Sequence, residues 1–212
     1  MNKKIKAVIF DVGGVLALSK NPIIIRRQGN RTFGVHEFIA RKLKISLDQW
    51  FDSIDTEYSD SIEGKISKEK VLSIISKNVK TPKRKLQKII LKAYKKNFKQ
   101  NKKLYKFAFK LKKQGYKIAI LSDQWYLSKQ ALLPEKISKK FDKIIISCDI
   151  GVRKPNLKIY KILLKKLNLP AENCLFIDNQ EWNLKPAKKL GMKTILFLNN
   201  KQLFRQLSKK LK

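Results

Sequence analysis

Four short apolar runs along this 212-residue chain each lead to polar residues that can take part in chemistry. In chain order, the runs lead to Asp11, Ser122–Asp123, Lys154 and Asp178. Because the carboxyl ends of parallel strands meet at one edge of a sheet, these side chains are expected to converge there. One nucleophilic carboxylate, one hydroxyl, one ammonium and a second carboxylate would then face a common substrate.

Such a set of groups suits attack on phosphorus. The carboxylate of Asp11 can form an acyl phosphate, which divides one difficult step into two easier ones. Because a carboxylate and a phosphate repel each other, Mg²⁺ is expected between Asp11 and Asp178, with a loop carbonyl and waters completing its shell. Ser122 Oγ and the backbone amides of Gly13–Gly14 can hold phosphoryl oxygens, and Lys154 can offset the negative charge.

The elements that must position these groups alternate between strands and helices after residue 100. Amphipathic helical patterns separate the apolar, strand-like runs, which are 5–10, 117–121, 144–146, 174–177 and 194–198. This alternation predicts an α/β fold with a Rossmann-like parallel sheet and helices on both faces. Near the start, Gly13–Gly14 marks a tight turn, and residues 3–16 are interpreted as a strand, a loop and a strand-like hairpin.

Residues from about 20 to 100 carry helical spacing without strands. Ser67 is typical of an N-cap, and Pro82 is expected to open a longer helix. The pattern therefore predicts a core of residues 1–19 and 100–212, with a separate helical bundle formed by residues 20–99.

Together, these segments resemble the haloacid dehalogenase superfamily. Its four motifs occur in order, as IFDVGGVL, ILSDQ, GVRKPNLKIY and FIDNQEWNLKPAKKLG. The resemblance covers nearly the whole chain. Residues 20–99 look like the family's helical C1 cap, in which 63–67 (EGKIS) resembles a recurring segment. Motifs one and three are similar to those of the sugar-phosphate (glucose-1-phosphate) phosphatase-like branch.

The resemblance implies a Mg²⁺-dependent phosphatase acting on a small phosphorylated metabolite. Asp11 would be the nucleophile and a metal ligand. The Gly13 carbonyl and Asp178 would be the other protein ligands of Mg²⁺. The groups that bind phosphate would be the hydroxyl of Ser122, the amide of Asp123 and the ammonium of Lys154.

Two positions depart from the pattern of most phosphatases in this family. Gly13 stands where a second aspartate usually acts as general acid and base, and Asn179 stands where motif four usually has another acid. General acid–base help typically contributes about 10²–10⁴-fold, so substrates with poor leaving groups should suffer most. A second reason for Gly13 would be a backbone conformation at this position that only glycine adopts readily.

Other functions and simpler roles stay open at this point. Relatives with dehalogenase activity also lack the second acid and often have a tryptophan where Trp182 falls, but they use no metal and generally lack an acid at the position of Asp178. A binding or regulatory protein on a decayed fold is another alternative. Taken alone, Asp11 can be a turn residue, and Asp178 can cap the following helix.

The formal net charge is +34, from 50 basic and 16 acidic residues. The lysines are spread along the chain at polar helix positions, which favours a solvated surface over a nucleic-acid site. We therefore expect no specific nucleic-acid partner. No apolar run approaches the length of a membrane span, so no membrane partner is expected either. The sequence leaves a monomer and a homodimer equally open.

The remaining candidate residues favour structural roles. Cys148 and Cys174 lie in apolar strand-like surroundings and are expected to be buried free thiols in a reducing, cytoplasmic compartment. His36 is the only histidine, which excludes ordinary zinc clusters, and a surface or packed position is expected for it. Trp50 and Tyr58 are expected in the core of the helical bundle. Arginines 26–27 (Arg26 and Arg27) are candidates for a second anionic group of the substrate.

Overall fold

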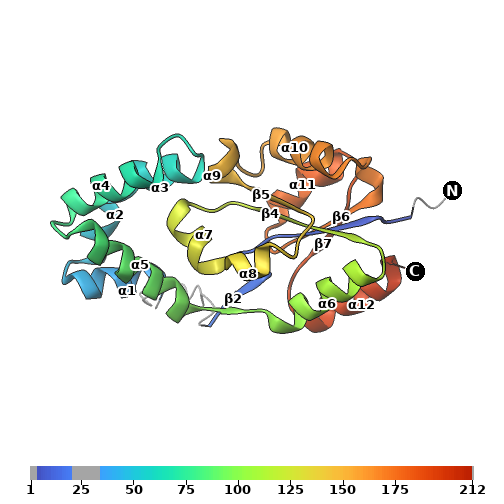
Figure 1. Ribbon diagram of the computed structural model, residues 1–212, viewed down its shortest axis with the longest axis horizontal. Coiled ribbons are helices and arrows are strands. Elements are labelled where there is room, and N and C mark those ends of the chain that lie inside the picture. The colour runs from blue at the N-terminus through green and yellow to red at the C-terminus, as the bar shows by residue number, and fades with distance from the viewer. Residues whose placement is uncertain (1–3, 21–33, 212) are drawn as a thin grey trace.

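The computed structural model describes residues 4–20 and 34–211. A parallel sheet carries helices on both faces, and a further group of helices lies beyond one end of it (Figure 1). The described strands are β1 (Ala7–Phe10), β2 (Ala17–Ser19), β3 (Phe98–Gln100), β4 (Lys117–Ser122), β5 (Lys143–Ile146), β6 (Cys174–Asp178) and β7 (Lys193–Leu196).

Most of the described chain is helical. The α-helices are α1 (Val35–Leu43), α2 (Leu47–Asp52), α3 (Asp55–Ile62), α4 (Lys68–Asn78), α5 (Lys83–Asn97), α6 (Lys102–Lys113), α7 (Tyr126–Leu132), α8 (Glu135–Ser138), α9 (Ser147–Ile150), α10 (Leu157–Leu167), α11 (Glu181–Lys189) and α12 (Asn200–Lys210), and a 3₁₀ helix covers Ala171–Asn173. None of these described helices is long and apolar enough to cross a bilayer.

The main sheet has the strand order β5-β4-β1-β6-β7, and all of its strands run parallel. Side chains of the central strand β1 alternate between two apolar clusters. Ala7 and Ile9 face the cluster that includes α10 and α11, whereas Val8 and Phe10 face the one that includes α6 and α12. Period-two alternation of fully buried residues is what a sheet covered on both faces requires. The predicted α/β fold is confirmed.

A short second sheet corrects the prediction for the first loop and for the end of the helical region. β2 does not form a hairpin with β1. It pairs antiparallel with β3, with Ala17 opposite Gln100 and Ser19 opposite Phe98. Phe98, expected on a helix, therefore begins a strand. β2, where the chain leaves the core, and β3, where it returns, satisfy each other's backbone hydrogen bonds. Such a pairing between distant segments cannot be seen in local periodicity.

Helices α1 to α5 lie side by side away from the main sheet (Figure 1). Their apolar faces nevertheless join the cluster on the α6–α12 side of the sheet. Ser67 caps α4 by accepting a hydrogen bond from the Lys70 amide at 3.2 Å, and α5 begins directly after Pro82, both as predicted. The division into a core and a cap at residues 20–99 remains a proposal. Arginines 26–27 lie outside the described residues.

The turn between α3 and α4 packs tightly against the segment around α9. Gly64 has a φ of +65°, and a Cβ there would lie 2.6 Å from the carbonyl oxygen of Cys148. Glu63 forms an ion pair with Arg153, at 3.3 Å between Oε1 and Nε. Because Arg153 precedes Lys154, this turn is held against the loop that carries the site lysine.

Several structural predictions are confirmed. Cys148 and Cys174 are both buried free thiols. His36 is packed, and its Nδ1 accepts a hydrogen bond of 2.9 Å from Nε1 of the fully buried Trp50. Tyr58 is half-buried with its ring 5.2 Å from that of Trp125. These residues therefore serve packing, as their apolar surroundings in the sequence indicated.

Candidate active site

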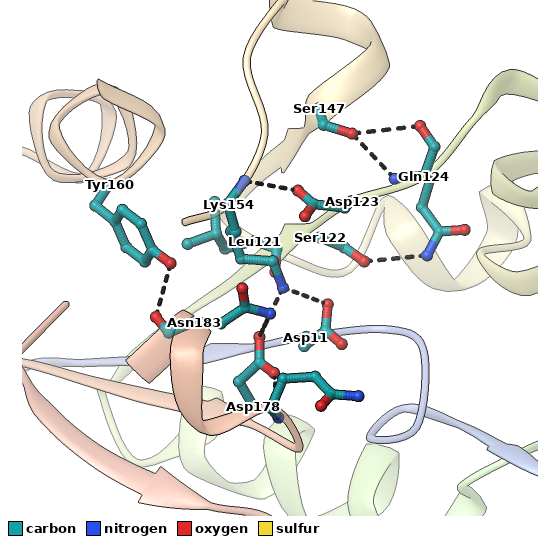
Figure 2. Close-up of polar contacts among 11 residues, drawn as sticks. Asp11, Leu121, Ser122, Asp123, Gln124, Ser147, Lys154, Tyr160, Asp178 and Asn183 are labelled. Atoms are coloured by element: carbon teal, nitrogen blue, oxygen red, sulfur yellow. Dashed lines mark hydrogen bonds and ion pairs between the residues drawn. The ribbon is translucent and has the colours of Figure 1, made fainter. Parts of the chain in front are cut away.

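Three adjacent parallel strands present their carboxyl ends at one edge of the sheet. β1 leads to Asp11, β4 ends at Ser122 and β6 ends at Asp178. Lys154 reaches the same place from the loop after α9, and Figure 2 shows these four side chains converging. All four are buried, with relative exposures of 6% or less. The convergence expected from strand-end positions is therefore present.

The ammonium group of Lys154 lies between the two carboxylates. Its Nζ is 3.0 Å from Asp11 Oδ1 and 2.6 Å from Asp178 Oδ2. The Lys154 amide donates to Asp123 Oδ1 at 3.1 Å, which ties the lysine loop to the end of β4. The backbone amide of Asp123 was predicted to bind phosphate. Its carboxylate also has a structural role, because it holds the lysine loop.

Burial and charge shift the proton affinities of these groups. Burial raises the pKa of Asp11 to about 6, opposed by the nearby Lys154 ammonium and reinforced by Asp178. Burial acts to lower the pKa of Lys154, but Asp11 and Asp178 outweigh it, so that pKa lies above its usual value. Burial also raises the pKa of Asp123. The lysine is therefore charged, and the carboxyl group of Asp11 is harder to ionise than that of a free aspartate.

A second set of contacts holds Asp178. Its Oδ1 accepts a hydrogen bond from the Gln180 amide at 2.7 Å, and its Oδ2 accepts one from Asn183 Nδ2 at 3.1 Å. Asn183 is fixed in turn, because Tyr160 Oη donates to its carbonyl oxygen at 2.7 Å. Asn183 was not predicted from the sequence. The sequence feature that could have revealed this residue is a polar side chain beside Leu184, on the apolar face of α11.

The Gly13–Gly14 turn shapes the other side of the site. Gly14 has a φ of +83°, and a Cβ there would lie only 2.4 Å from Asn179 Nδ2. Gly14 also donates its amide to the Ala17 carbonyl oxygen at 2.8 Å. That amide is committed to the turn in this structure, so it does not point to the phosphate contact that was predicted for it. The amide of Gly13 makes none of the hydrogen bonds that close the turn.

The donor set fits Mg²⁺. Asp11 and Asp178 offer buried carboxylate oxygens on either side of the Lys154 ammonium, which supplies the positive charge in this structure. The carbonyl oxygen of Gly13 accepts none of the hydrogen bonds of its turn. Among residues 4–20 and 34–211, no group of three or more His, Cys, Asp or Glu side chains is placed to bind a metal. Hard oxygen ligands completed by water are typical of Mg²⁺ rather than of zinc.

Comparisons with known proteins identify a family and similar folds for this chain. A family model for haloacid dehalogenase-like hydrolases matches residues 5–191. Bifunctional epoxide hydrolase 2 of Rattus norvegicus is 35% identical over 103 residues, which are 46% of this chain and 19% of the rat protein. Glyceraldehyde 3-phosphate phosphatase of Methanocaldococcus jannaschii is 34% identical over 96 residues, or 42% of this chain and 40% of that protein. The chain thus covers less than half the length of either relative.

Solved structures share the fold over nearly the whole chain. The HAD family enzyme bt-2542 of Bacteroides thetaiotaomicron superimposes with a TM-score of 0.75 at 19% identity, covering 96% of this chain and 100% of that one. A HAD phosphatase from Thermococcus onnurineus gives a TM-score of 0.60 at 20% identity, covering 92% and 87%. With the family model spanning most of its length, the chain belongs to the haloacid dehalogenase-like hydrolases and is a hydrolase with phosphatases among its relatives.

Proposed function

We propose that this hydrolase is a Mg²⁺-dependent phosphatase that acts on a small phosphorylated metabolite through an aspartyl-phosphate intermediate. The observation that carries the proposal is the buried Lys154 ammonium held between Asp11 and Asp178. A dianionic phosphate needs positive charge beside the nucleophile, and this arrangement supplies it with carboxylates suited to Mg²⁺. In support, bt-2542 of Bacteroides thetaiotaomicron has been crystallised with magnesium and inorganic phosphate.

The residues of the site share the tasks of this mechanism. The Asp11 carboxylate attacks phosphorus and displaces the oxygen of the leaving group, and water then hydrolyses the acyl phosphate to give free Asp11 and phosphate. Ser122 Oγ donates to a phosphoryl oxygen, and Lys154 offsets charge on the nucleophile and on the transferred group. Asp11, Asp178 and the Gly13 carbonyl would hold the Mg²⁺ ion. Bound Mg²⁺ would reduce repulsion between the carboxylate and the incoming phosphate.

The leaving group decides which substrates fit best. No carboxylate is present at position 13 to protonate the departing oxygen or to activate water. Attack by Asp11 does not need that group, whereas departure of a simple alkoxide does. We therefore propose that anomeric and acyl phosphates, whose oxygens leave readily, are better substrates than alkyl phosphates.

A dehalogenase-type reaction is the second candidate, favoured by the glycine at position 13. Its fold also occurs among the neighbours, since a dehalogenase superimposes with a TM-score of 0.58 at 18% identity. The fully buried Asp178 weighs against this candidate, because dehalogenase relatives generally lack an acid at that position and use no metal. A catalytically weak binding protein remains the third candidate.

A panel of phosphorylated metabolites, including sugar 1-phosphates, assayed with and without Mg²⁺, tests the proposal. We expect turnover that requires Mg²⁺ and disappears in Asp11→Asn, because an amide is not a nucleophile here. The matched control is Asp48→Asn, the same change at an exposed position of α2. Phosphatase activity that survives in Asp11→Asn would refute the mechanism, and an inactive wild type would favour the binding-protein alternative.

Metal binding is tested separately by Mg²⁺ titration calorimetry. Asp178→Ala should lose Mg²⁺ binding, because it removes one of the two carboxylates of the ligand set. Unchanged affinity in that variant would place the metal elsewhere and exclude the proposed ligand set.

A further inference from the structure

Gln124, two residues beyond the end of β4, is buried to 5% exposure beside the catalytic groups. Ser147, at the start of α9, fixes its backbone: the Gln124 amide donates to Ser147 Oγ at 3.1 Å, and Ser147 Oγ lies 3.4 Å from the Gln124 carbonyl oxygen. Its side-chain amide bridges two further serines, as Figure 2 shows for the contact with Ser122. A buried amide with a partner on every side has little freedom to move.

The contact lengths fix which way the side-chain amide faces. Ser128 Oγ lies 2.6 Å from Gln124 Oε1, a length typical of an O–H···O bond. Gln124 Nε2 lies 3.1 Å from Ser122 Oγ, within the usual range of an N–H···O bond. The hydroxyl of Ser128 is therefore the donor to Gln124, and Gln124 is the donor to Ser122.

This direction determines where the Ser122 proton points. A serine hydroxyl has one proton, and its oxygen is already occupied by the N–H of Gln124. The proton must then turn away from Gln124, toward the side of the site where Asp11 lies. In agreement, a hydrogen bond from Ser122 contributes to lowering the pKa of Asp11 against the larger effect of burial.

We propose that Gln124 is a positioning residue that directs the Ser122 hydroxyl toward Asp11 and toward the phosphoryl group, and that Ser128 holds Gln124 in this orientation. The proposal rests on the proposed function, since it concerns phosphate bound at the same site. A hydroxyl that is already oriented loses less freedom when it donates to phosphate, so the ordering of this serine increases phosphate affinity.

Calorimetric titration with inorganic phosphate at saturating Mg²⁺ tests the proposal without depending on turnover. Gln124→Leu keeps much of the volume and removes the donor, so phosphate affinity should fall about three- to tenfold, the equivalent of one ordinary hydrogen bond. Ser128→Ala should weaken binding in the same direction, because the amide can then turn over. Mg²⁺ affinity without phosphate should stay within about twofold of wild type in both variants.

A matched control separates orientation from general loss of packing. Ser53 resembles Ser128: each is a buried serine whose Oγ lies near the carbonyl oxygen three residues earlier, at 2.7 Å from Trp50 and 3.1 Å from Trp125. Ser53→Ala lies on the helical region away from the catalytic strands and should leave phosphate affinity unchanged. A loss in Ser53→Ala as large as in Ser128→Ala would overturn the proposal.

The decisive measurement repeats Gln124→Leu in a Ser122→Ala background. If Gln124 acts through the Ser122 hydroxyl, Gln124→Leu should change phosphate affinity by less than about twofold in the protein that already carries Ser122→Ala. An equal loss in both backgrounds, or none in either, would show that Gln124 does not act through Ser122. A wild type that binds Mg²⁺ but no phosphate would instead overturn the proposed function, and this proposal with it.

Discussion

Gly13→Asp restores the carboxylate that most phosphatases of this family carry two residues after the nucleophile. The backbone of Gly13 does not lie in the left-handed region, and a Cβ there would meet only Gln124 Nε2, at the ordinary contact distance of 3.9 Å. The idea that the backbone demands glycine at this position is therefore wrong for this structure. We expect the variant to fold, with the introduced carboxylate accepting a hydrogen bond from the side-chain amide of Gln124.

The expected gain follows from these surroundings. General acid–base catalysis contributes about 10²–10⁴-fold. The lower end applies here, because Gln124 competes for the new carboxylate and because Asp11 and Asp178 repel it. A gain of about 10²-fold in kcat/KM corresponds to about 3 kcal/mol of transition-state stabilisation. It should appear with alkyl phosphates and be nearly absent with aryl or acyl phosphates, whose leaving groups need no proton.

The assay compares kcat/KM for glycerol 3-phosphate and p-nitrophenyl phosphate in wild type, Gly13→Asp and Gly13→Asn. The asparagine variant has the same shape but transfers no proton, so it serves as the control. The reasoning is refuted if Gly13→Asp stays folded and binds Mg²⁺ while the ratio of the two rates does not change. An equal gain in Gly13→Asn would assign the effect to shape rather than to proton transfer.

The other predictions concern the buried charges, the glycine turn, the response to pH and the basic surface. Lys154→Met leaves two buried carboxylates uncompensated, so the metal-free protein should lose about 3–5 kcal/mol of unfolding free energy in urea denaturation, and an unchanged midpoint would contradict the role of the ammonium. Gly14→Ala should lower the melting temperature more than Gly115→Ala, because both have positive φ but only Gly14 also meets Asn179, and equal losses would dismiss that contact. Because the folded pKa of Asp11, about 6, lies above its ordinary value of 3.8, metal-free protein should gain stability as the pH falls from about 7 to about 4; an Asp11→Asn variant with the same stability gain would contradict this assignment. Nucleic-acid binding, if measured, should be independent of sequence and lost by about 200 mM salt, and a shallow salt slope would reveal a real site.

The convergence of the candidate site residues was predictable because its signals are local. An apolar β-branched run followed by Asp11 and two glycines marks a strand end, and the same holds for Ser122 and Asp178. Parallel strands then bring such ends to one edge whatever their order in the sheet. Lys154 needed more than local pattern, since it is one of many lysines, and only its place in the third motif distinguished it.

The contacts that were not predicted connect residues distant in sequence. Ser147 meets Gln124 across 23 positions, and Ala17 of β2 pairs with Gln100 of β3. Neither pairing leaves a periodic trace, because each depends on how separate elements pack. Gln124 itself is a lone polar residue after a strand, which in isolation indicates only a turn. Its role became visible from the lengths of its contacts, not from its identity.

The ion pairs of Lys154 have a consequence for how the newly made chain folds. In many small metalloproteins, the free energy of metal binding is also the free energy of folding, so the chain stays unfolded until the metal binds. Here the polypeptide carries its own counter-ion, because the Lys154 ammonium is paired with both buried carboxylates before any metal ion binds. The nascent chain can therefore complete its core in magnesium-poor surroundings. Withdrawal of Mg²⁺ should leave an intact, dormant protein that regains activity without refolding.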